Sequence, residues 1–578
     1  MRIISPYNKI LFIAFFLALF SLTRAQDKFP QGYFANPLTI PISLAGTFGE
    51  IRSNHFHTGL DIRTDGKEGL PVLASANGYI CRINVSPYGY GNALYIKHPN
   101  GFVTVYGHLS RYNPAIAAYV KERQYELQKF AVDLYPNAGE MAVKKGDTVA
   151  FSGSTGAAEG PHLHFEIRDD KEEDPINPML FGLACTDKLP PVIAGISVYP
   201  LNDSSNVNGR HEPVYINTVN RTGTLHLAAD SAINAYGMIG IGIRTYDMAD
   251  GADNHNGPYT EVLMDAKDTL YYSRMDDLSF GAMRYINGHV DYEAFLKKKE
   301  TFEHSFLEDN DKLDIYKKVT NRGRIKFEKG AAIHHLKYDV SDFQGNNTEL
   351  LFDIGGETVR GSIRRDTIKY KGMISWKKPF DYHYKGMSLH IPTDAIFQNV
   401  RFYCSDAASP LHTLCPIYHI INEYVPLSSS YTLNISPSAP LPDSVLRKAV
   451  IIQWTGGRIH SVGGAYDSGS IIAHPKSFGD FSIMLDLVRP EIKPLNIYKG
   501  KNMSKATDIE FEISDNLSGI AGYNAYVDGK WILMGYNPKK DMIYYTFDEH
   551  VKEGNHHLKL VVTDNVGNVN TYEVDFTR

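Results

Sequence analysis

The sequence predicts a mostly β protein built from several modules. Aromatic residues make up 12% of the chain, with 37 Tyr and 28 Phe, which favours β structure. Gly and Pro are also abundant, at 48 and 29 residues, and they break short apolar runs in the way that turns separate strands. At about 150 residues per domain, a length of 578 residues predicts roughly four domains.

The N-terminus has the features of an export signal. Arg2 and Lys9 accompany an apolar run over residues 10–22, and Ala25 places a small residue where a signal peptidase reads the chain. The run has about 13 residues, too few to span a hydrocarbon core of about 30 Å comfortably. We therefore expect residues 1–25 to be a signal peptide, with an uncleaved anchor as the alternative. The mature chain would work in the periplasm or cell envelope, or outside the cell, and no later stretch resembles a membrane span.

The overall charge and the cysteine count exclude two classes of protein. Lys and Arg total 59 against 65 Asp and Glu, a net charge of −6, which argues against a general nucleic-acid binder. The four cysteines, at 81, 185, 404 and 415, are too few for a disulfide scaffold, and none has the CxxC spacing of a cysteine zinc site. Cys404 and Cys415 either pair across neighbouring strands or remain buried thiols.

Residues 26–185 are expected to form the first domain, an antiparallel β-sheet with one inserted helix. Asn113 and Pro114 make a good N-cap and first-turn pair, and apolar residues then recur at helical spacing as far as Leu134. We therefore expect a helix near 114–134, within an insertion of about 113–136. The segment Leu189-Pro190-Pro191 looks like a linker to the next domain.

An internal repeat organises the rest of the chain. Residues 334–354 (HHLKYDVSDFQGNNTELLFDI) align without gaps with residues 556–576 (HHLKLVVTDNVGNVNTYEVDF). Each copy reads as two strands joined by a polar Asp/Asn/Gly turn. Upstream, the segment YDMADG at 246–251 loosely matches ISDNLSG at 513–519.

The repeat predicts two related β-sandwich modules that resemble immunoglobulin-like modules of bacterial surface proteins. They would occupy residues 189–355 and 488–578. The first carries an insertion in which a helix is expected at Tyr292–Glu303. Residues 356–487 are expected to form a further β-rich module, in which no motif indicates a function.

Three short motifs in the first domain point to a metal site. His162 and His164 lie in a run with strand character, so both side chains should project from the same face. His57 and Asp61, spaced as HxxxD, can add a nitrogen and an oxygen, and His108 lies in a separate Tyr-Gly-His segment. Two imidazoles and a carboxylate with an open fourth position are how a catalytic zinc ion is held.

These motifs and their flanking sequence resemble the M23 (LytM or lysostaphin-type) zinc metallopeptidases. The resemblance covers about residues 46–170, through FGEIRSNHFHTGLDIRT, VYGHLS and KKGDTVAFSGSTGAAEGPHLHFEIRD. It implies one Zn²⁺ ion bound by His57, Asp61 and His164. It also implies that His108 and His162 are catalytic.

The two spare histidines have a chemical task, because no Glu adjoins the pair as in HExxH enzymes. His108 and His162 are expected to transfer protons or to stabilise the oxyanion, and the sequence does not divide these tasks. Glu166 would share the face of His164; an exposed acid is the favoured interpretation, and orientation of a ligand imidazole is the alternative. His55 is expected at the rim of the site. The inserted helix either walls the cleft or packs on the surface.

The resemblance implies hydrolysis of peptide bonds in bacterial peptidoglycan. A D,D-endopeptidase acting on stem-peptide crosslinks is favoured over glycyl-glycine cleavage. The alternative is a non-hydrolytic or latent LytM-like activator or scaffold of other wall hydrolases, since some domains of this type lack the metal ligands. The β modules are expected to position the enzyme against wall, glycan or a partner protein.

Overall fold

The computed structural model describes residues 28–183, 185–228, 232–251, 254–328, 330, 332–357 and 368–578. Antiparallel β-sheets dominate these residues, so the predicted fold class is confirmed. The expected signal peptide at 1–25 lies outside the described residues. Within the described ranges, no helix combines the length and the apolar character needed to cross a membrane.

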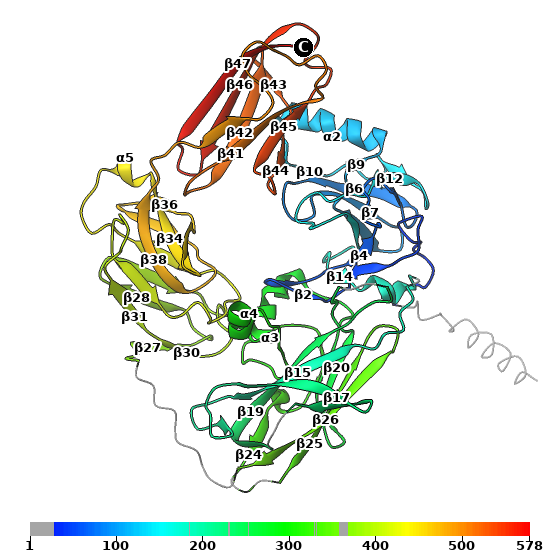
Figure 1. The fold of residues 1–578 in the computed structure, drawn as a ribbon, viewed down its shortest axis with the longest axis vertical. Helices are drawn as coiled ribbons and strands as arrows, with labels where there is room; N and C mark the ends of the chain where they lie inside the picture. Colours follow the sequence, from blue (N-terminus) through cyan, green and yellow to red (C-terminus); the bar gives the residue numbers. More distant parts are fainter. Residues whose placement is uncertain are drawn as a thin grey trace, which may run out of the picture.

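The N-terminal domain is built on one large antiparallel sheet with a small second sheet beside it (Figure 1). Leu163, Phe165 and Ile167 have no exposed surface, and they anchor the central strand of the large sheet in the core. The small sheet joins β5 (Pro71–Leu73), β12 (Thr148–Phe151) and β9 (Arg111–Tyr112). In spatial order the large sheet contains β1 (Leu44–Gly46), β4 (Leu60–Arg63), β13 (His162–Asp169), β8 (Phe102–Gly107), β7 (Asn92–Lys97), β6 (Gly78–Val85) and β10 (Val132–Leu134).

The predicted inserted helix is present but shorter than expected. Helix α2 spans Pro114–Leu127, and the Asn113 side chain accepts a hydrogen bond from the Ile116 amide as its N-cap. It ends at Gln128, whose backbone is left-handed, and Val132–Leu134 then form strand β10 against β6. The prediction of a helix as far as 134 was wrong. The apolar residues near 130–134 fit a period of two as well as a helical one, and strand pairing decides between them.

The second domain contains one extensive sheet and an insertion. The path of the sheet is β18 (Thr224–Leu227), β17 (Val214–Arg221), β15 (Val192–Pro200), β19 (Ile233–Tyr246), β26 (Asn347–Gly356), β25 (His334–Ser341), β20 (Thr260–Asp265), β21 (Asp268–Arg274) and β23 (Tyr316–Val319). The insertion carries α3 (Ile286–His289) and α4 (Tyr292–Lys298). The helix predicted for Tyr292–Glu303 therefore ends earlier, and Glu303–His304 form strand β22. Met283, Ile286 and Ile315 of this insertion join the buried core of the N-terminal domain.

The third and fourth domains each enclose a core between two sheets. The third uses β28 (Phe380–Tyr384), β29 (Met387–Ile391), β33 (Thr432–Ile435), β37 (Ser470–Ala473) and β36 (Ala465–Asp467) against β31 (Cys404–Ala407), β32 (Ile417–Ile420), β38 (Gly479–Leu485), β34 (Ala449–Thr455) and β35 (Arg458–Ser461). The fourth uses β39 (Glu491–Pro494), β41 (Asp508–Ser514), β45 (Met542–Thr546) and β44 (Gly535–Asn537) against β40 (Lys501–Asn502), β47 (Val569–Thr577), β46 (Asn555–Asp564), β42 (Ile520–Val527) and β43 (Lys530–Ile532). All four cysteines are free thiols, and Cys404 and Cys415 are buried.

The internal repeat corresponds to two equivalent hairpins. In the second domain β25 pairs with β26, with His334 opposite Ile354. In the fourth domain β46 pairs with β47, with His556 opposite Phe576. The two hairpins therefore share one register, as the gapless alignment predicts.

The four domains follow one another around a closed loop, so that the last domain contacts the first (Figure 1). Helix α2 makes one part of this contact. The Tyr125 hydroxyl donates to Asp548 Oδ2 at 2.6 Å, and the Tyr125 ring stacks on His550 with 3.9 Å between centroids. Lys121 pairs with Glu549 at 2.7 Å. The inserted helix is thus an attachment point for the C-terminal module, a role that its own sequence did not indicate.

Candidate metal centre

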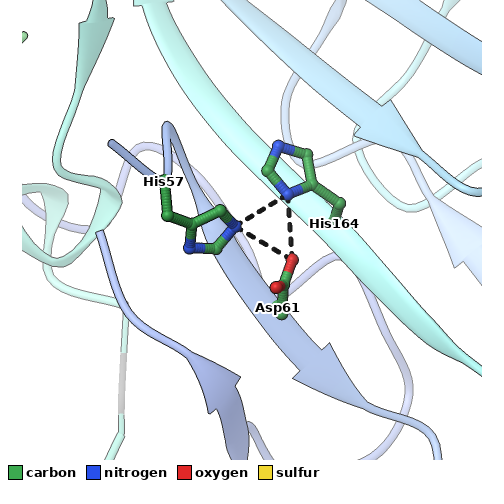
Figure 2. A group of neighbouring side chains, drawn as sticks. All are labelled: His57, Asp61 and His164. Atoms are coloured by element: carbon green, nitrogen blue, oxygen red, sulfur yellow. Dashed lines mark hydrogen bonds and ion pairs between the residues drawn. The ribbon is translucent and has the colours of Figure 1, made fainter. Parts of the chain in front are cut away.

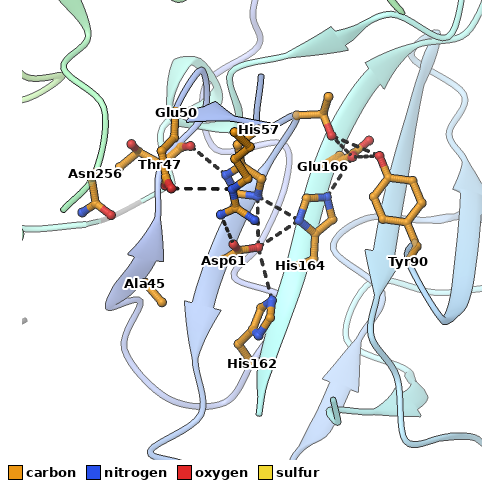
Figure 3. Close-up of polar contacts among 12 residues, drawn as sticks. Ala45, Thr47, Glu50, His57, Asp61, Tyr90, His162, His164, Glu166 and Asn256 are labelled. Atoms are coloured by element: carbon orange, nitrogen blue, oxygen red, sulfur yellow. Dashed lines mark hydrogen bonds and ion pairs between the residues drawn. The ribbon is translucent and has the colours of Figure 1, made fainter. Parts of the chain in front are cut away.

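Neighbouring strands bring the three motifs together. Strand β13 lies between β4 and β8, with His164 opposite Asp61 on one side and opposite Gly107 on the other. His108 directly follows Gly107, and His57 lies just before β4. His162 and His164 project from the same face of β13, as predicted, while Leu163 between them is fully buried in the core. Figure 3 shows His57, Asp61, His162 and His164 together. The His108 ring lies 4.8 Å from the His162 ring between centroids, so all five predicted site residues meet in one place.

The three expected ligand atoms converge on one point (Figure 2). His57 Nε2 lies 3.0 Å from Asp61 Oδ1 and 3.0 Å from His164 Nδ1. His164 Nδ1 lies 2.9 Å from Asp61 Oδ1. Bonds of about 2.0–2.1 Å to a tetrahedral zinc ion would place such atoms about 3.3 Å apart. The donor set and its spacing therefore fit a zinc ion that holds three protein ligands and leaves one position open.

Each candidate ligand is oriented by a hydrogen bond on its far side (Figure 3). His57 Nδ1 lies 2.7 Å from the Thr47 carbonyl; since a carbonyl only accepts, Nδ1 carries the proton and Nε2 is free to bind. Arg52 Nη2 donates to Asp61 Oδ2 at 2.7 Å, which leaves Oδ1 facing the site. His164 Nε2 donates to Glu166 at 2.8 Å, which leaves Nδ1 facing the site. Such outer partners fix the tautomer and direction of metal ligands.

Glu166 is buried, and the expectation that it is an exposed acid was wrong. Its side chain has no exposed surface, and it accepts hydrogen bonds from His164, from Arg168 Nε at 2.5 Å and from the Tyr90 hydroxyl at 2.7 Å. Burial alone would raise the pKa of Glu166, but the Arg168 charge and the His164 hydrogen bond lower it below its usual range. Glu166 is thus a buried carboxylate that holds the His164 imidazole in place.

The charge state of the metal-free site follows from the same contacts. Burial favours a neutral His164, but hydrogen bonds to Asp61 and Glu166 outweigh it and raise the pKa of His164 to about 9. A metal ion must therefore displace a proton from this group, and ion binding is expected to release protons at neutral pH.

His108 and His162 flank the three candidate ligands with one ring nitrogen free. His108 Nδ1 lies 2.9 Å from the Thr155 carbonyl and His162 Nδ1 lies 2.8 Å from the Gly160 carbonyl, so both Nε2 atoms are available for proton transfer. His162 Nε2 lies 3.4 Å from Asp61 Oδ1. Burial and the neighbouring histidines lower the pKa of His108 to about 3, so His108 is neutral at working pH.

The backbone of His108 has a positive φ of 60°, uncommon for a residue with a side chain. The neighbouring turns fit closely around it. A Cβ on Gly156 would come within 2.3 Å of the Gly91 amide, so these two turns require glycine to pack together. Because Thr155 precedes Gly156, this packing fixes the carbonyl that orients His108.

The C-terminal module reaches the same loop. Lys539, in the turn between β44 and β45, donates to the Ser154 carbonyl at 2.8 Å and also to the Ala158 carbonyl. These carbonyls lie in the loop that presents Thr155 and Gly160 to the two catalytic candidates. The last domain therefore supports the loop that positions His108 and His162.

Sequence reasoning missed the outer partners Thr47, Arg52, Tyr90 and Thr155. Arg168 was the one sequence signal that Glu166 is buried in an ion pair, because it lies two residues after Glu166 on the same strand and therefore shares its face. His55, expected at the rim, is exposed on β3 (His55–Phe56).

Comparison with known proteins places this site in a defined class: the chain contains a peptidase family M23 domain, whose family profile matches residues 55–125 and 126–178. A Zu5-like domain profile matches residues 371–486, the region in which the sequence showed no motif. The DD-carboxypeptidase/endopeptidase Mpg of Neisseria meningitidis is 36% identical over 162 residues, which is 28% of this chain and 28% of that protein. The peptidoglycan DD-endopeptidase ShyB of Vibrio cholerae is 32% identical over 111 residues, which is 19% of this chain and 20% of that protein.

The similarity to solved structures covers part of the chain. The catalytic domain of lysostaphin from Staphylococcus simulans is 26% identical, with 24% of this chain and 91% of that chain covered and a TM-score of 0.19. The matched region spans little more than a quarter of the length of Mpg. The same match covers 28% of this chain, so most of the chain lies outside it.

Proposed function

We propose that the protein is an exported zinc metalloendopeptidase that hydrolyses peptide crosslinks of bacterial peptidoglycan, with D,D-endopeptidase activity favoured. The observation that carries this proposal is the convergence of two histidine nitrogens and one carboxylate oxygen within 3.0 Å of one another, next to two more histidines. His57, Asp61 and His164 would hold the zinc ion. Bound zinc would polarise the scissile carbonyl and lower the pKa of a bound water toward neutrality.

The residues around the metal supply the rest of the chemistry. His108 and His162 would take up and return the protons of the reaction, or donate to the oxyanion, through their Nε2 atoms. His108 is neutral at working pH and its Nδ1 faces the Thr155 carbonyl, so its Nε2 carries a free lone pair that can accept a hydrogen bond from the attacking water. Arg52, Thr47 and Glu166 would position the ligands without touching the substrate.

The named relatives support a cell-wall substrate. Mpg is named a DD-carboxypeptidase/endopeptidase, and ShyB is named a peptidoglycan DD-endopeptidase. Export through the segment 1–25 would bring the enzyme to this substrate in the periplasm or cell envelope. The other three domains would hold the peptidase domain against wall, glycan or a partner protein.

Digestion of purified peptidoglycan followed by mass spectrometry of the muropeptides tests this proposal. A D,D-endopeptidase converts crosslinked dimers to monomers, and His164→Ala should abolish that conversion together with bound zinc. His108→Ala and His162→Ala should keep zinc but lose turnover. His55→Ala is the matched control, because this exposed histidine lies two residues from His57 and is expected to leave both zinc and activity unchanged. Full activity of His164→Ala would refute the site.

A second candidate is a latent or non-hydrolytic activator of other wall hydrolases, which is supported by the similarity to the lipoprotein NlpD/LppB homolog of Pseudomonas aeruginosa, 32% identical over 134 residues. This function predicts a zinc-loaded protein that leaves purified wall intact but accelerates a separate hydrolase. Measurement of zinc content alongside muropeptide release, with and without an added hydrolase, distinguishes the two functions.

A further inference from the structure

Each copy of the internal repeat brings three aspartates together. Asp187, Asp247 and Asp342 form the first group, with one oxygen of each within 4.8 Å of the others. Asp187 lies in the linker that leaves the N-terminal domain, Asp247 follows β19, and Asp342 lies in the β25–β26 turn. A second group occupies the equivalent place in the last module and consists of Asp486, Asp515 and Asp564.

The two groups are built by the same hydrogen bonds. Asn346 Nδ2 donates to Asp342 Oδ2 at 2.6 Å and to the backbone carbonyl of Asp187 at 3.1 Å. In the last module, Asn568 Nδ2 donates to Asp564 at 2.6 Å and to the carbonyl of Asp486 at 3.0 Å. In both copies the turn asparagine bonds one carboxylate of the hairpin and the backbone carbonyl of the linker aspartate, and so it ties the linker to the hairpin.

The first group carries charge that the protein does not compensate. Asp247 is 4% exposed, and its Oδ1 atom has no hydrogen-bond partner. Among the described ion pairs, none involves Asp187, Asp247 or Asp342. Burial and the charges of Asp342 and Asp187 raise the pKa of Asp247 to about 7. A buried, unpaired carboxylate oxygen is costly unless a cation binds it.

In the second group, backbone amides compensate more of the carboxylate charge, so a bound cation is less necessary. Asp515 Oδ2 accepts hydrogen bonds from the amides of Leu517 and Gly519, and Asp486 Oδ2 accepts one from the Ser518 amide. In the first group, Asp342 Oδ1 accepts hydrogen bonds from the amides of Gly345 and Asn346, and Asp187 accepts one from the Leu189 amide. Each group retains one carboxylate oxygen without a hydrogen-bond partner, Asp247 Oδ1 and Asp515 Oδ1. Asp247 is the more deeply buried of the two, so the uncompensated charge is greatest in the first group.

We infer that Asp187, Asp247 and Asp342 bind a Ca²⁺ ion at the junction between the peptidase domain and the second domain. The donors are all oxygens, which suits a hard cation, and Ca²⁺ bonds of about 2.3–2.6 Å allow ligand atoms up to about 5 Å apart. Mg²⁺ is disfavoured because it requires a tight octahedron with bonds of about 2.0–2.1 Å.

The position of the ion gives it a structural task. Phe343, next to Asp342, packs against the core of the peptidase domain, and Gln344 Nε2 donates to the Cys185 carbonyl in the linker. An ion shared by linker and hairpin would fix how the peptidase domain sits on the second domain. The site does not depend on the proposed peptidase activity.

Calorimetric titration tests this inference on the full mature chain, stripped of metal and resupplied with one equivalent of zinc. CaCl₂ should bind, and Asp247→Asn should bind one Ca²⁺ ion fewer than the wild-type protein. Asp268→Asn is the control, because Asp268 is an exposed aspartate in the same domain and should leave Ca²⁺ binding unchanged. MgCl₂ should bind at least tenfold more weakly. Equal Ca²⁺ stoichiometry and affinity in Asp247→Asn and wild type would overturn the inference.

Thermal unfolding provides a second readout. Millimolar CaCl₂ should raise the Tm of the wild-type protein by several degrees and should raise that of Asp247→Asn by less. In calcium-free buffer Asp247→Asn should melt no lower than wild type, because it removes an unpaired buried charge. If Asp247→Asn fails to fold, Asp187→Asn in the linker gives the same comparison. A wild-type Tm that CaCl₂ leaves unchanged would also overturn the inference.

Discussion

Replacement of Glu166 by Gln tests whether the buried carboxylate behind His164 governs metal binding. Glu166 accepts from His164 Nε2 at 2.8 Å with one oxygen and from Arg168 Nε at 2.5 Å with the other. Gln has one acceptor oxygen and one amide group, so it can satisfy His164 or Arg168 but not both. Loss of such an outer partner typically weakens metal binding by about 10–100-fold.

The same substitution breaks a buried ion pair. Arg168 and Glu166 side chains are 5% and 0% exposed, so removal of the negative partner leaves an uncompensated buried guanidinium. The cost of breaking such a pair is about 3–5 kcal/mol. We therefore expect the metal-free Glu166→Gln protein to lose roughly this amount of its unfolding free energy in urea denaturation.

Two measurements and one control separate these effects. Zinc affinity is measured by competition with a chromophoric chelator, and stability is measured by denaturation of the metal-free protein. Glu173→Gln is the matched control. Glu173 Oε2 lies 4.0 Å from Arg168 Nη1, but the Glu173 side chain is on the surface, with 55% of it exposed. The control should change stability by at most about 1 kcal/mol and leave zinc binding intact. Wild-type zinc affinity in Glu166→Gln would refute the reasoning.

Three further predictions concern pH, the domain contact and the active-site loop. Burial lowers the pKa of His98 to about 4. Since the unfolded chain then binds the proton more tightly, the unfolding free energy should fall by about 3 kcal/mol as pH drops from about 6.5 to about 4, and His98→Gln should flatten that fall. Tyr125→Ala removes the ring stack on His550, and the molecule should expand in small-angle X-ray scattering. Lys539→Ala should lower kcat several-fold at unchanged zinc content, because the loop that orients His108 and His162 loses its support.

Each of these predictions has a clear opposing outcome. An acid limb of the stability curve that is identical in wild type and His98→Gln would exclude His98 as its source. Glu122, exposed on α2, is the control for Tyr125, and equal scattering of Glu122→Ala and Tyr125→Ala would mean that this contact does not close the loop of domains. Lys540→Ala is the neighbouring control for Lys539, and a similar loss of kcat in both variants would remove the specific role of the Lys539 hydrogen bonds.

The convergence of the candidate ligands was predictable in part from local periodicity, while the choice of His164 as the second imidazole ligand came from the resemblance to the M23 family. His162 and His164 share a face on any strand, and the HxxxD spacing selected His57 and Asp61 in advance of the structure. The burial of Glu166 was not predictable in the same way. It depends on Tyr90 and Thr58, which reach Glu166 from distant parts of the sequence.

The fold class followed from composition and turn patterns, but the element ends and the domain contacts did not. The apolar residues near 130–134 fit helical and strand periods equally well, so the sequence alone could not predict that they form β10 and pair with β6. The role of α2 was hidden because Tyr125 makes its contacts with a module more than 400 residues away, as the separation of Tyr125 and Asp548 shows. The repeat, by contrast, identified the matching hairpins of β25–β26 and β46–β47.

The closed loop of domains has a consequence for how a bulky polymer reaches the catalytic face. Helix α2 and the last domain belong to one chain, so they meet at an effective concentration of the order of millimolar. Noncovalent contacts that are too weak to join two separate proteins can therefore hold them together. Such an attachment can release and rejoin within microseconds to milliseconds, the range of hinged domain motions. An attachment of this kind would let the single chain open around the proposed crosslinked substrate and close again without dissociation of a separate subunit.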